Sequence, residues 1–243
     1  MGIRPEVLPF VGVAIVAGLL VALVARRLMH AASRRAGLWG LAVALIAGAY
    51  FLYFFRDPER VAPSDPAIVV AGADGHIAAL AVLKPGEFRR MAAFCGLAGA
   101  DLEAWNGDVA RISIFLSLFD VHVNRAPIAG ASRFLGYFPG RHLFTFTEKS
   151  SDVNQHNSIL IVGQGTRCLV NQIVGPVARR VVYWPDHDRA VELPKGARVS
   201  MMKFGSRMDM YFPAADVEVA ARVGDTVRAG ETPVARLRGK AKE

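Results

Sequence analysis

Cysteine is scarce in this sequence, and its scarcity excludes two classes of protein. The 243 residues contain two cysteines, Cys95 and Cys168, which lie far apart and belong to no CxxC or Cys/His pattern. A disulfide framework and a structural zinc site are therefore unsupported, and we expect no metal. Both cysteines are predicted to be small core residues, a usage that suits a reducing cytoplasm.

Other signatures are absent as well. The sequence has no glycine-rich phosphate loop, no low-complexity tract and no clear long internal repeat. It also lacks a nucleic-acid-binding motif, although its net charge of +8 indicates an anionic partner. Lipid headgroups are the anionic partner that fits the rest of the sequence.

Two stretches near the N-terminus contain no charged residue. Residues 8–25 and 38–55 are each 18 residues long, and an α-helix of that length spans about 27 Å, near the lower limit for crossing a bilayer core. We interpret residues 1–56 as an uncleaved helical membrane hairpin. The alternatives are a cleaved signal peptide for the first stretch and a buried core helix for the second. The first stretch is longer than a usual signal-peptide core, and a second apolar stretch soon follows it.

Basic residues gather around this hairpin. Residues 1–55 contain five arginines and one glutamate, a net charge of +4 and so half of the total. Four arginines lie in the connecting loop and two follow the second stretch: Arg26, Arg27, Arg34, Arg35, Arg56 and Arg60. The positive-inside rule attracts both groups to the cytoplasm, whereas two full spans would separate them. The sequence thus leaves open whether the hairpin spans the membrane or re-enters the same leaflet.

The remainder of the chain, residues 57–243, has a β pattern. Short runs of β-type residues are separated by Gly, Pro, Asn and Asp, at residues 68–70, 77–83, 109–116, 132–138, 158–162, 167–174 and 177–184. Such spacing predicts a mainly β domain, an antiparallel sandwich or barrel. Only residues 87–97 have a helical pattern in this part.

The dipeptide Gly205-Ser206 is the strongest chemical signal. A serine hydroxyl can attack the carbonyl of the residue before it, and glycine leaves that approach unhindered. The amide becomes an ester, and elimination leaves dehydroalanine, which hydrolyses to a pyruvoyl group on the new N-terminus. Gly-Ser pairs are common in turns, but here β-compatible residues flank the pair at 198–204 and 208–213. We therefore expect one strand interrupted at its middle, and a precursor cut between residues 205 and 206.

Self-cleavage needs a base near the Ser206 hydroxyl, because serine alone is a poor nucleophile at neutral pH. Histidine is the natural candidate, and His122 closely follows the apolar run 112–116, where a strand opens into a loop. Arg125 cannot act as a base near neutral pH. Its guanidinium could bind a carboxylate or phosphate, or it could be a solvated loop arginine, and the sequence leaves both open.

Five short motifs occur in one order between residues 51 and 215. They are FFRDPER at 54–60, ADG at 73–75, DVHVNRAP at 120–127, GPVARR at 175–180 and KFGSR at 203–207. Together they resemble the phosphatidylserine decarboxylases, most closely the short bacterial form. The resemblance implies a proenzyme that cleaves itself at Gly205-Ser206 into a large and a small subunit, and a covalent pyruvoyl cofactor derived from Ser206. It further implies decarboxylation of phosphatidylserine to phosphatidylethanolamine at the cytoplasmic face of the inner membrane.

The same resemblance implies roles for individual residues. Asp74 matches the family aspartate that orients a histidine in a Ser-His-Asp relay, although by itself Asp74-Gly75 would be taken as a common turn. The longer bacterial relatives have His-x-x-His where this chain has His122 and Arg125. His122 is therefore expected to serve both self-cleavage and decarboxylation, or His76 takes one role. The oligomeric state stays open, a homo-oligomer included.

Two other functions are compatible with the sequence. Residues 223–230 resemble the turn of biotinyl and lipoyl carrier domains, and Lys203 resembles their attachment site, which would make a membrane-tethered carrier. In carriers, however, that turn precedes the modified lysine, whereas here it follows. A pyruvoyl decarboxylase of a soluble amino acid is the other alternative, and the two apolar stretches argue against it.

Overall fold

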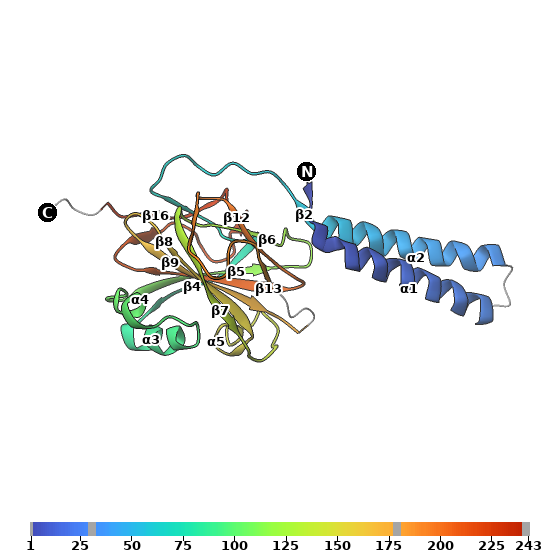
Figure 1. Ribbon diagram of the computed structural model, residues 1–243, viewed down its shortest axis with the longest axis horizontal. Helices are drawn as coiled ribbons and strands as arrows, with labels where there is room; N and C mark the ends of the chain where they lie inside the picture. Colours follow the sequence, from blue (N-terminus) through green and yellow to red (C-terminus); the bar gives the residue numbers. More distant parts are fainter. Residues whose placement is uncertain (1, 29–32, 177–180, 240–243) are drawn as a thin grey trace. The chain divides into compact units, whose positions relative to one another are not determined.

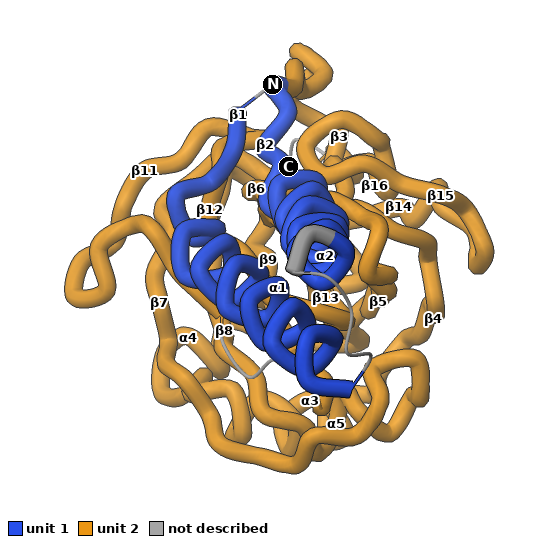
Figure 2. The backbone as a smooth tube through the Cα atoms, turned by 90° about the vertical axis from the view of Figure 1, so that its right-hand side faces the viewer, with its two compact units in different colours: residues 1–59 blue, residues 60–243 orange. Residues whose placement is uncertain are grey.

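The computed structural model describes residues 2–28, 33–176 and 181–239. The chain divides into two compact units, Met1–Glu59 and Arg60–Glu243, which Figure 2 shows in different colours. The boundary expected from the sequence, between residues 56 and 57, lies close to this division.

The first unit is a hairpin of two helices (Figure 1). It consists of strand β1 (Gly2–Ile3), a 3-10 turn (Pro5–Val7), helices α1 (Leu8–Leu28) and α2 (Ser33–Phe54), and strand β2 (Arg56–Asp57), which pairs with β1. The two helices approach closely at Gly18 and Gly40, because a Cβ on Gly18 would lie 2.6 Å from the Gly40 carbonyl oxygen. Small residues at such a crossing let two helix backbones pack tightly in lipid.

Both helices expose large apolar side chains. Leu19, Leu45 and Ile46 are 61%, 63% and 72% exposed. Over Pro5–Leu28 and Arg35–Phe54 the helices are long and apolar enough to cross a membrane. A helix that is apolar on nearly all sides suits lipid rather than water. Of the predicted basic loop, residues 29–32 and the side chain of Arg34 lie outside the described part of the chain.

The second unit is built on an antiparallel sheet of eight strands (Figure 1). In their order across the sheet, the strands are β11 (Val191–Leu193), β7 (Gly130–Phe138), β8 (His156–Val162), β9 (Arg167–Val174), β13 (Ser206–Pro213), β5 (Val109–Leu116), β4 (Gly75–Leu83) and β15 (Thr226–Val227). Strand β13 is central and pairs with β9 and β5. All eight of its residues are buried, so both of its faces lie inside the unit.

Two small sheets cover one face of the large sheet. One contains β10 (Val181–Tyr183), β12 (Arg198–Met202) and β6 (Val123–Arg125), and the other β14 (Val217–Val219), β16 (Pro233–Leu237) and β3 (Ile68–Val70). Residues of all three sheets form one apolar core, among them Ile112, Met210, Val199 and Val234. This layered antiparallel fold confirms the predicted β class. The described strands close no barrel, because β11 and β15 each pair on one side only.

A helix covers the opposite face. In α3 (Pro85–Ala93), Phe88 packs on Trp105 at 4.7 Å between ring centroids and belongs to a second apolar cluster with Tyr211 of β13. Proline suits the first position of a helix. The helix ends earlier than the predicted residue 97, since Gly96 has a left-handed φ of 71°. Two shorter helices complete the unit, α4 (Gly99–Glu103) and α5 (Ser150–Val153).

Most predicted strands are present, and three have the predicted bounds, 68–70, 109–116 and 167–174. Residues 177–180 of another predicted strand lie outside the described residues, and β10 covers most of its remainder. One prediction is wrong. The single strand expected on both sides of Gly205-Ser206 is two strands, β12 and β13, which belong to different sheets.

Candidate active site

The bond between Gly205 and Ser206 lies where the chain leaves the small sheet of β12 and enters the large sheet. Phe204 and Gly205 have positive φ angles of 53° and 67°. This left-handed conformation costs a non-glycine residue such as Phe204 about 1–3 kcal/mol. A Cβ on Gly205 would meet no atom within 4 Å, so glycine is needed there for its backbone conformation and not for space. The predicted cleavage bond thus follows two left-handed residues, of which Phe204 is strained.

Ser206 is the first residue of β13 and lies between two neighbouring strands. It pairs with Leu116 at the end of β5 and with Val174 at the end of β9. Its side chain is completely buried, and the hydroxyl makes no hydrogen bond to any of the described residues. A buried hydroxyl without a partner is unfavourable and uncommon in a structural role. The arrangement is compatible with a hydroxyl that acts as a nucleophile.

The carbonyl that this hydroxyl would attack lies against Gly175. A Cβ on Gly175 would be 2.9 Å from the Gly205 carbonyl oxygen and 3.5 Å from Cγ2 of Thr145. Thr145 is 3% exposed, so its side chain points into this region. Gly175 therefore leaves room for the carbonyl, and Thr145 lies beside it. Gly175 stands in a motif noted in the sequence without a role, and nothing in the sequence pointed to Thr145.

His122 precedes β6 and is completely buried. Its carbonyl accepts a hydrogen bond of 3.1 Å from the backbone N–H of Met202, which brings it to the strand that leads into Ser206. Its Nδ1 lies 3.0 Å from the carbonyl oxygen of Asp120. Because a carbonyl can only accept, Nδ1 carries the proton and Nε2 has the lone pair in the neutral ring. This is the tautomer that a general base needs.

Asp74, which precedes β4, is paired with Arg60. The two guanidinium Nη atoms lie 2.6 and 2.7 Å from the two carboxylate oxygens, and the backbone N–H of Ala229 donates to Oδ1 at 2.8 Å. These are the hydrogen-bond partners of Asp74 among the described residues, and His122 is not one of them. Both oxygens of the Asp74 carboxylate are therefore paired with Arg60. The predicted relay would instead require this carboxylate to accept a hydrogen bond from the His122 imidazole.

Backbone hydrogen bonds nevertheless join the segments that carry Asp74 and His122. The N–H of Val70 donates to the carbonyl of Pro127, and the N–H of Arg125 donates to that of Gly72, so the two segments run antiparallel. Asp74 follows Gly72 by two residues, and His122 precedes Arg125 by three. Backbone hydrogen bonds thus join the segment of His122 to the segment of Asp74 and to the strand that precedes Ser206, while the Asp74 carboxylate is paired with Arg60.

Arg125 is buried, whereas His76 is exposed. Arg125 is 5% exposed and donates from Nη1 to the Gly196 carbonyl at 2.9 Å, so the solvated-loop alternative is wrong. His76 is exposed and pairs across the sheet with Phe115, which in turn pairs with Arg207. Cross-strand partners share a face, and Arg207 faces away from Ser206, its neighbour in β13. His76 therefore lies on the opposite face of the sheet from Ser206.

Comparison with known proteins assigns the chain to a family. The sequence profile of phosphatidylserine decarboxylase matches residues 47–235, a range that includes every predicted site residue. The chain belongs to this family. A phosphatidylserine decarboxylase proenzyme from Desulfotalea psychrophila is 36% identical over 194 residues, 79% of this chain and 82% of the relative. One from Gluconacetobacter diazotrophicus is 38% identical over 199 residues, 82% of this chain and 81% of the relative. No solved structure matches the chain.

In this member of the decarboxylase family, buried charged residues lie on the face of β13 opposite to the Ser206 side chain. Arg207, 1% exposed, donates from Nε to Asp209 at 2.9 Å and from Nη2 to Glu148 at 3.1 Å. Arg111 also donates to Glu148. Glu148 lies three residues after Thr145, so these ion pairs attach the segment carrying Thr145 to the strand that begins at Ser206.

A cavity of about 480 Å³ adjoins these charges and is lined by Arg111, Glu148, Cys95 and His156, among others. Burial raises the pKa of the Cys95 thiol to about 11, so the thiol stays protonated and is a poor nucleophile. Burial also lowers the pKa of His156, whose Nδ1 lies 2.9 Å from the Asn154 carbonyl. Within the described ranges, no cluster of three or more His, Cys, Asp or Glu could hold a metal ion.

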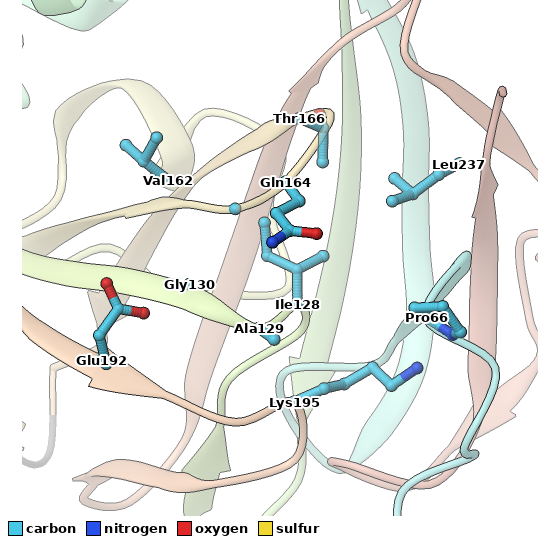
Figure 3. A pocket seen from close by; sticks show the side chains of 11 residues that line it. Pro66, Ile128, Ala129, Gly130, Val162, Gln164, Thr166, Glu192, Lys195 and Leu237 are labelled. Atoms are coloured by element: carbon cyan, nitrogen blue, oxygen red, sulfur yellow. The ribbon is translucent and has the colours of Figure 1, made fainter. Parts of the chain in front are cut away.

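Another cavity, of about 460 Å³, lies beside the turn between β8 and β9, and Figure 3 shows the residues that line it. Gln164 and Thr166 of the β8–β9 turn line it, together with Lys195. The Lys195 ammonium donates to the carbonyls of Asp65 and Ile68. None of the predicted site residues of the family lines this cavity, and β9 separates its turn from Val174, the partner of Ser206.

Proposed function

We propose that the chain is a pyruvoyl-dependent phosphatidylserine decarboxylase, made as a precursor that cleaves itself between Gly205 and Ser206. Membership of the family supports the reaction, and the relatives' name of proenzyme supports the processing. The observation that carries the proposal is the buried Ser206 hydroxyl, which no described residue binds and which directly follows the left-handed residues Phe204 and Gly205.

For self-cleavage, we assign His122 as the base that accepts the Ser206 proton. Its Nδ1–H is held by the Asp120 carbonyl. That carbonyl is itself fixed, because the Asp120 carboxylate accepts from the N–H and hydroxyl of Ser117, both at 2.7 Å. Asp74 is assigned as a positioning carboxylate beside this histidine, and its negative charge is compensated by Arg60. Thr145 and Gly175 shape the space around the carbonyl under attack.

The residues present fit a pyruvoyl group at position 206. Ser206 would supply the three carbons of the group, its hydroxyl oxygen would leave with the Gly205 carboxylate, and water would supply the keto oxygen as the nitrogen leaves as ammonia. A pyruvoyl group serves as an electron sink when a carboxylate is lost as CO₂. We assign His122 to give or take a proton there, and Arg125 to bind an anionic group of the substrate.

Intact mass spectrometry of the purified chain tests the proposal directly. We expect fragments of residues 1–205 and 206–243, the second with a blocked keto terminus, and we expect Ser206→Ala to remain one inactive chain. An active chain that stays uncleaved would overturn the proposal. Release of CO₂ from free serine but not from phosphatidylserine vesicles would instead favour a soluble substrate.

The carrier alternative receives little support from the fold. In a carrier, the turn and the modified lysine belong to one small domain. Here the turn at residues 223–230 contains β15, which pairs with β4 of the large sheet, and Lys203 lies between β12 and β13. A biotinyl or lipoyl adduct on Lys203 in the same mass spectrum would restore it.

For location, we propose the cytoplasmic face of the inner membrane. The two apolar helices support membrane association, and Arg56 and Arg60, which follow the second helix, favour the cytoplasm for the second unit. Protease digestion of inverted and right-side-out vesicles tests the orientation. Cleavage of the second unit only in right-side-out vesicles would contradict it.

A further inference from the structure

Two phenylalanines stand exposed on the loop that also carries Thr145. Phe144 and Phe146 are 60% and 65% exposed, and their rings stack with centroids 5.4 Å apart and planes 20° apart. Thr145, between them, is 3% exposed. Successive side chains therefore alternate between the outside and the candidate active site, so that one short segment presents apolar rings outward and a hydroxyl inward.

The loop is firmly held in place. The Asn154 side chain accepts from the Leu143 N–H at 2.9 Å and donates to the Leu143 carbonyl at 2.7 Å and the Val174 carbonyl at 3.0 Å. Glu148, further along, is paired with Arg207 and Arg111. The loop is therefore attached on both sides of the rings, and clustered apolar side chains in contact with water mark a surface that meets a partner.

The position of the rings indicates which partner. Val174, which holds the loop through Asn154, pairs with Ser206, so the two rings lie at the Ser206 end of the large sheet. Arg141 and Lys149 are exposed on either side of the rings. Aromatic rings flanked by basic side chains suit the boundary between headgroups and acyl chains in a bilayer that contains anionic lipid.

We propose that Phe144 and Phe146 form a lipid-docking surface that inserts into the bilayer beside the active site. Docking there would let the headgroup of an anionic phospholipid reach position 206 while its acyl chains stay in the bilayer. The delivery of a phospholipid headgroup to position 206 rests on the proposed function. The insertion itself does not depend on the chemistry at Gly205-Ser206, and it is separate from anchoring by the N-terminal helices.

Site-specific fluorescence tests the insertion. Cys95 and Cys168 are buried, so a cysteine introduced as Phe146→Cys can be labelled with an NBD fluorophore selectively. The matched control is Asn106→Cys, an exposed position near the start of β5, about 24 Å along that strand from the Ser206 end. The full chain is reconstituted in vesicles of phosphatidylcholine and phosphatidylserine that contain a spin-labelled lipid.

We expect the spin-labelled lipid to quench the probe at position 146 several-fold more than the probe at 106. Equal quenching at both positions would overturn the proposal. A probe at 146 that is shielded from water but not quenched would also overturn it, because another part of the protein or a second copy would then cover the rings.

Activity gives an independent test. In Phe144→Ser/Phe146→Ser, turnover of phosphatidylserine in vesicles is expected to fall about tenfold or more, since the apolar anchor is lost. Turnover of a monomeric short-chain phosphatidylserine and self-cleavage are expected to persist. Phe144→Leu/Phe146→Leu keeps the apolar surface and should retain vesicle activity. Equal losses on both substrates, or no loss on vesicles, would contradict docking, whereas a wild-type chain inactive on both substrates would refute the proposed function and leave the quenching test intact.

Discussion

Arg207, the residue after the proposed cleavage bond, donates from Nη2 to Glu148 at 3.1 Å. Glu148 belongs to the loop that brings Thr145 to the Gly205 carbonyl, and it also accepts from Arg111. Arg207 keeps a second partner, Asp209, within its own strand. Cleavage would leave residue 206 as a new chain end, and this pair would hold that end beside the loop.

Replacing Glu148 by Gln should loosen this attachment. Because the Glu148 side chain is 58% exposed and Arg207 retains Asp209, we expect a loss of only about 1 kcal/mol in the free energy of unfolding. Self-cleavage should slow, because the Thr145 loop is no longer fixed to β13. Both effects can be measured by chemical denaturation and by the time course of fragment formation. The control is the exposed Glu103→Gln, and a Glu148→Gln chain that behaves like it would show that the pair has no positioning role.

Gly175→Ala tests the space around the Gly205 carbonyl. The added Cβ would lie 2.9 Å from that oxygen, a contact that only a backbone movement can relieve. We expect self-cleavage to slow by about tenfold or more, since a displacement near 1 Å can cost a hundredfold in rate. Gly86→Ala is the matched control, because its Cβ would meet no atom within 4 Å. Equal cleavage rates in the two variants would show that the carbonyl does not need this space.

These residues show where sequence reasoning succeeded and where it stopped. The strands of the large sheet could be predicted because a run of β-type residues is a local pattern in the sequence. The helices α1 and α2 could be predicted because each contains a long run without charged residues. Gly205-Ser206 was visible because its chemistry resides in two adjacent residues. That β12 and β13 belong to different sheets was not, because sheet membership is decided by partners far away in the chain, such as Val123 and Leu116.

The ion pair between Asp74 and Arg60 could not be predicted from the sequence for the same reason. The guanidinium partner of Asp74 comes from Arg60, and nothing in the local Asp-Gly pattern distinguishes a carboxylate that faces an imidazole from one that faces an arginine. Thr145 was missed because its role depends on contact with Gly175, 30 positions away in the numbering. A motif records which residues a site uses, but it does not record the contacts among them.

The Arg60–Asp74 pair therefore offers a test of the assigned role of the aspartate. Both side chains are nearly buried, so Arg60→Met should cost about 3–5 kcal/mol of stability by leaving an unpaired carboxylate. If Asp74 positions His122, Asp74→Asn should slow self-cleavage more than Arg60→Lys, which keeps both charges. Cleavage is followed by intact mass at matched temperatures below each melting point. The assignment fails should Asp74→Asn cleave at the wild-type rate.

His156 makes stability depend on pH. Burial lowers its pKa below the ordinary value, and this outweighs the opposite effects of the Asn154 carbonyl and Asp209. Below a pH of about 6.5 the unfolded chain binds a proton at this residue that the folded chain does not, so the free energy of unfolding falls as the pH drops. The loss approaches about 1.4 kcal/mol for each pH unit between the two pKa values. His156→Gln cannot titrate and should show a shallower decline between pH 7 and 5. Denaturation of both chains in a Ser206→Ala background keeps a single polypeptide, and identical slopes would exclude His156 as a source of the acid sensitivity.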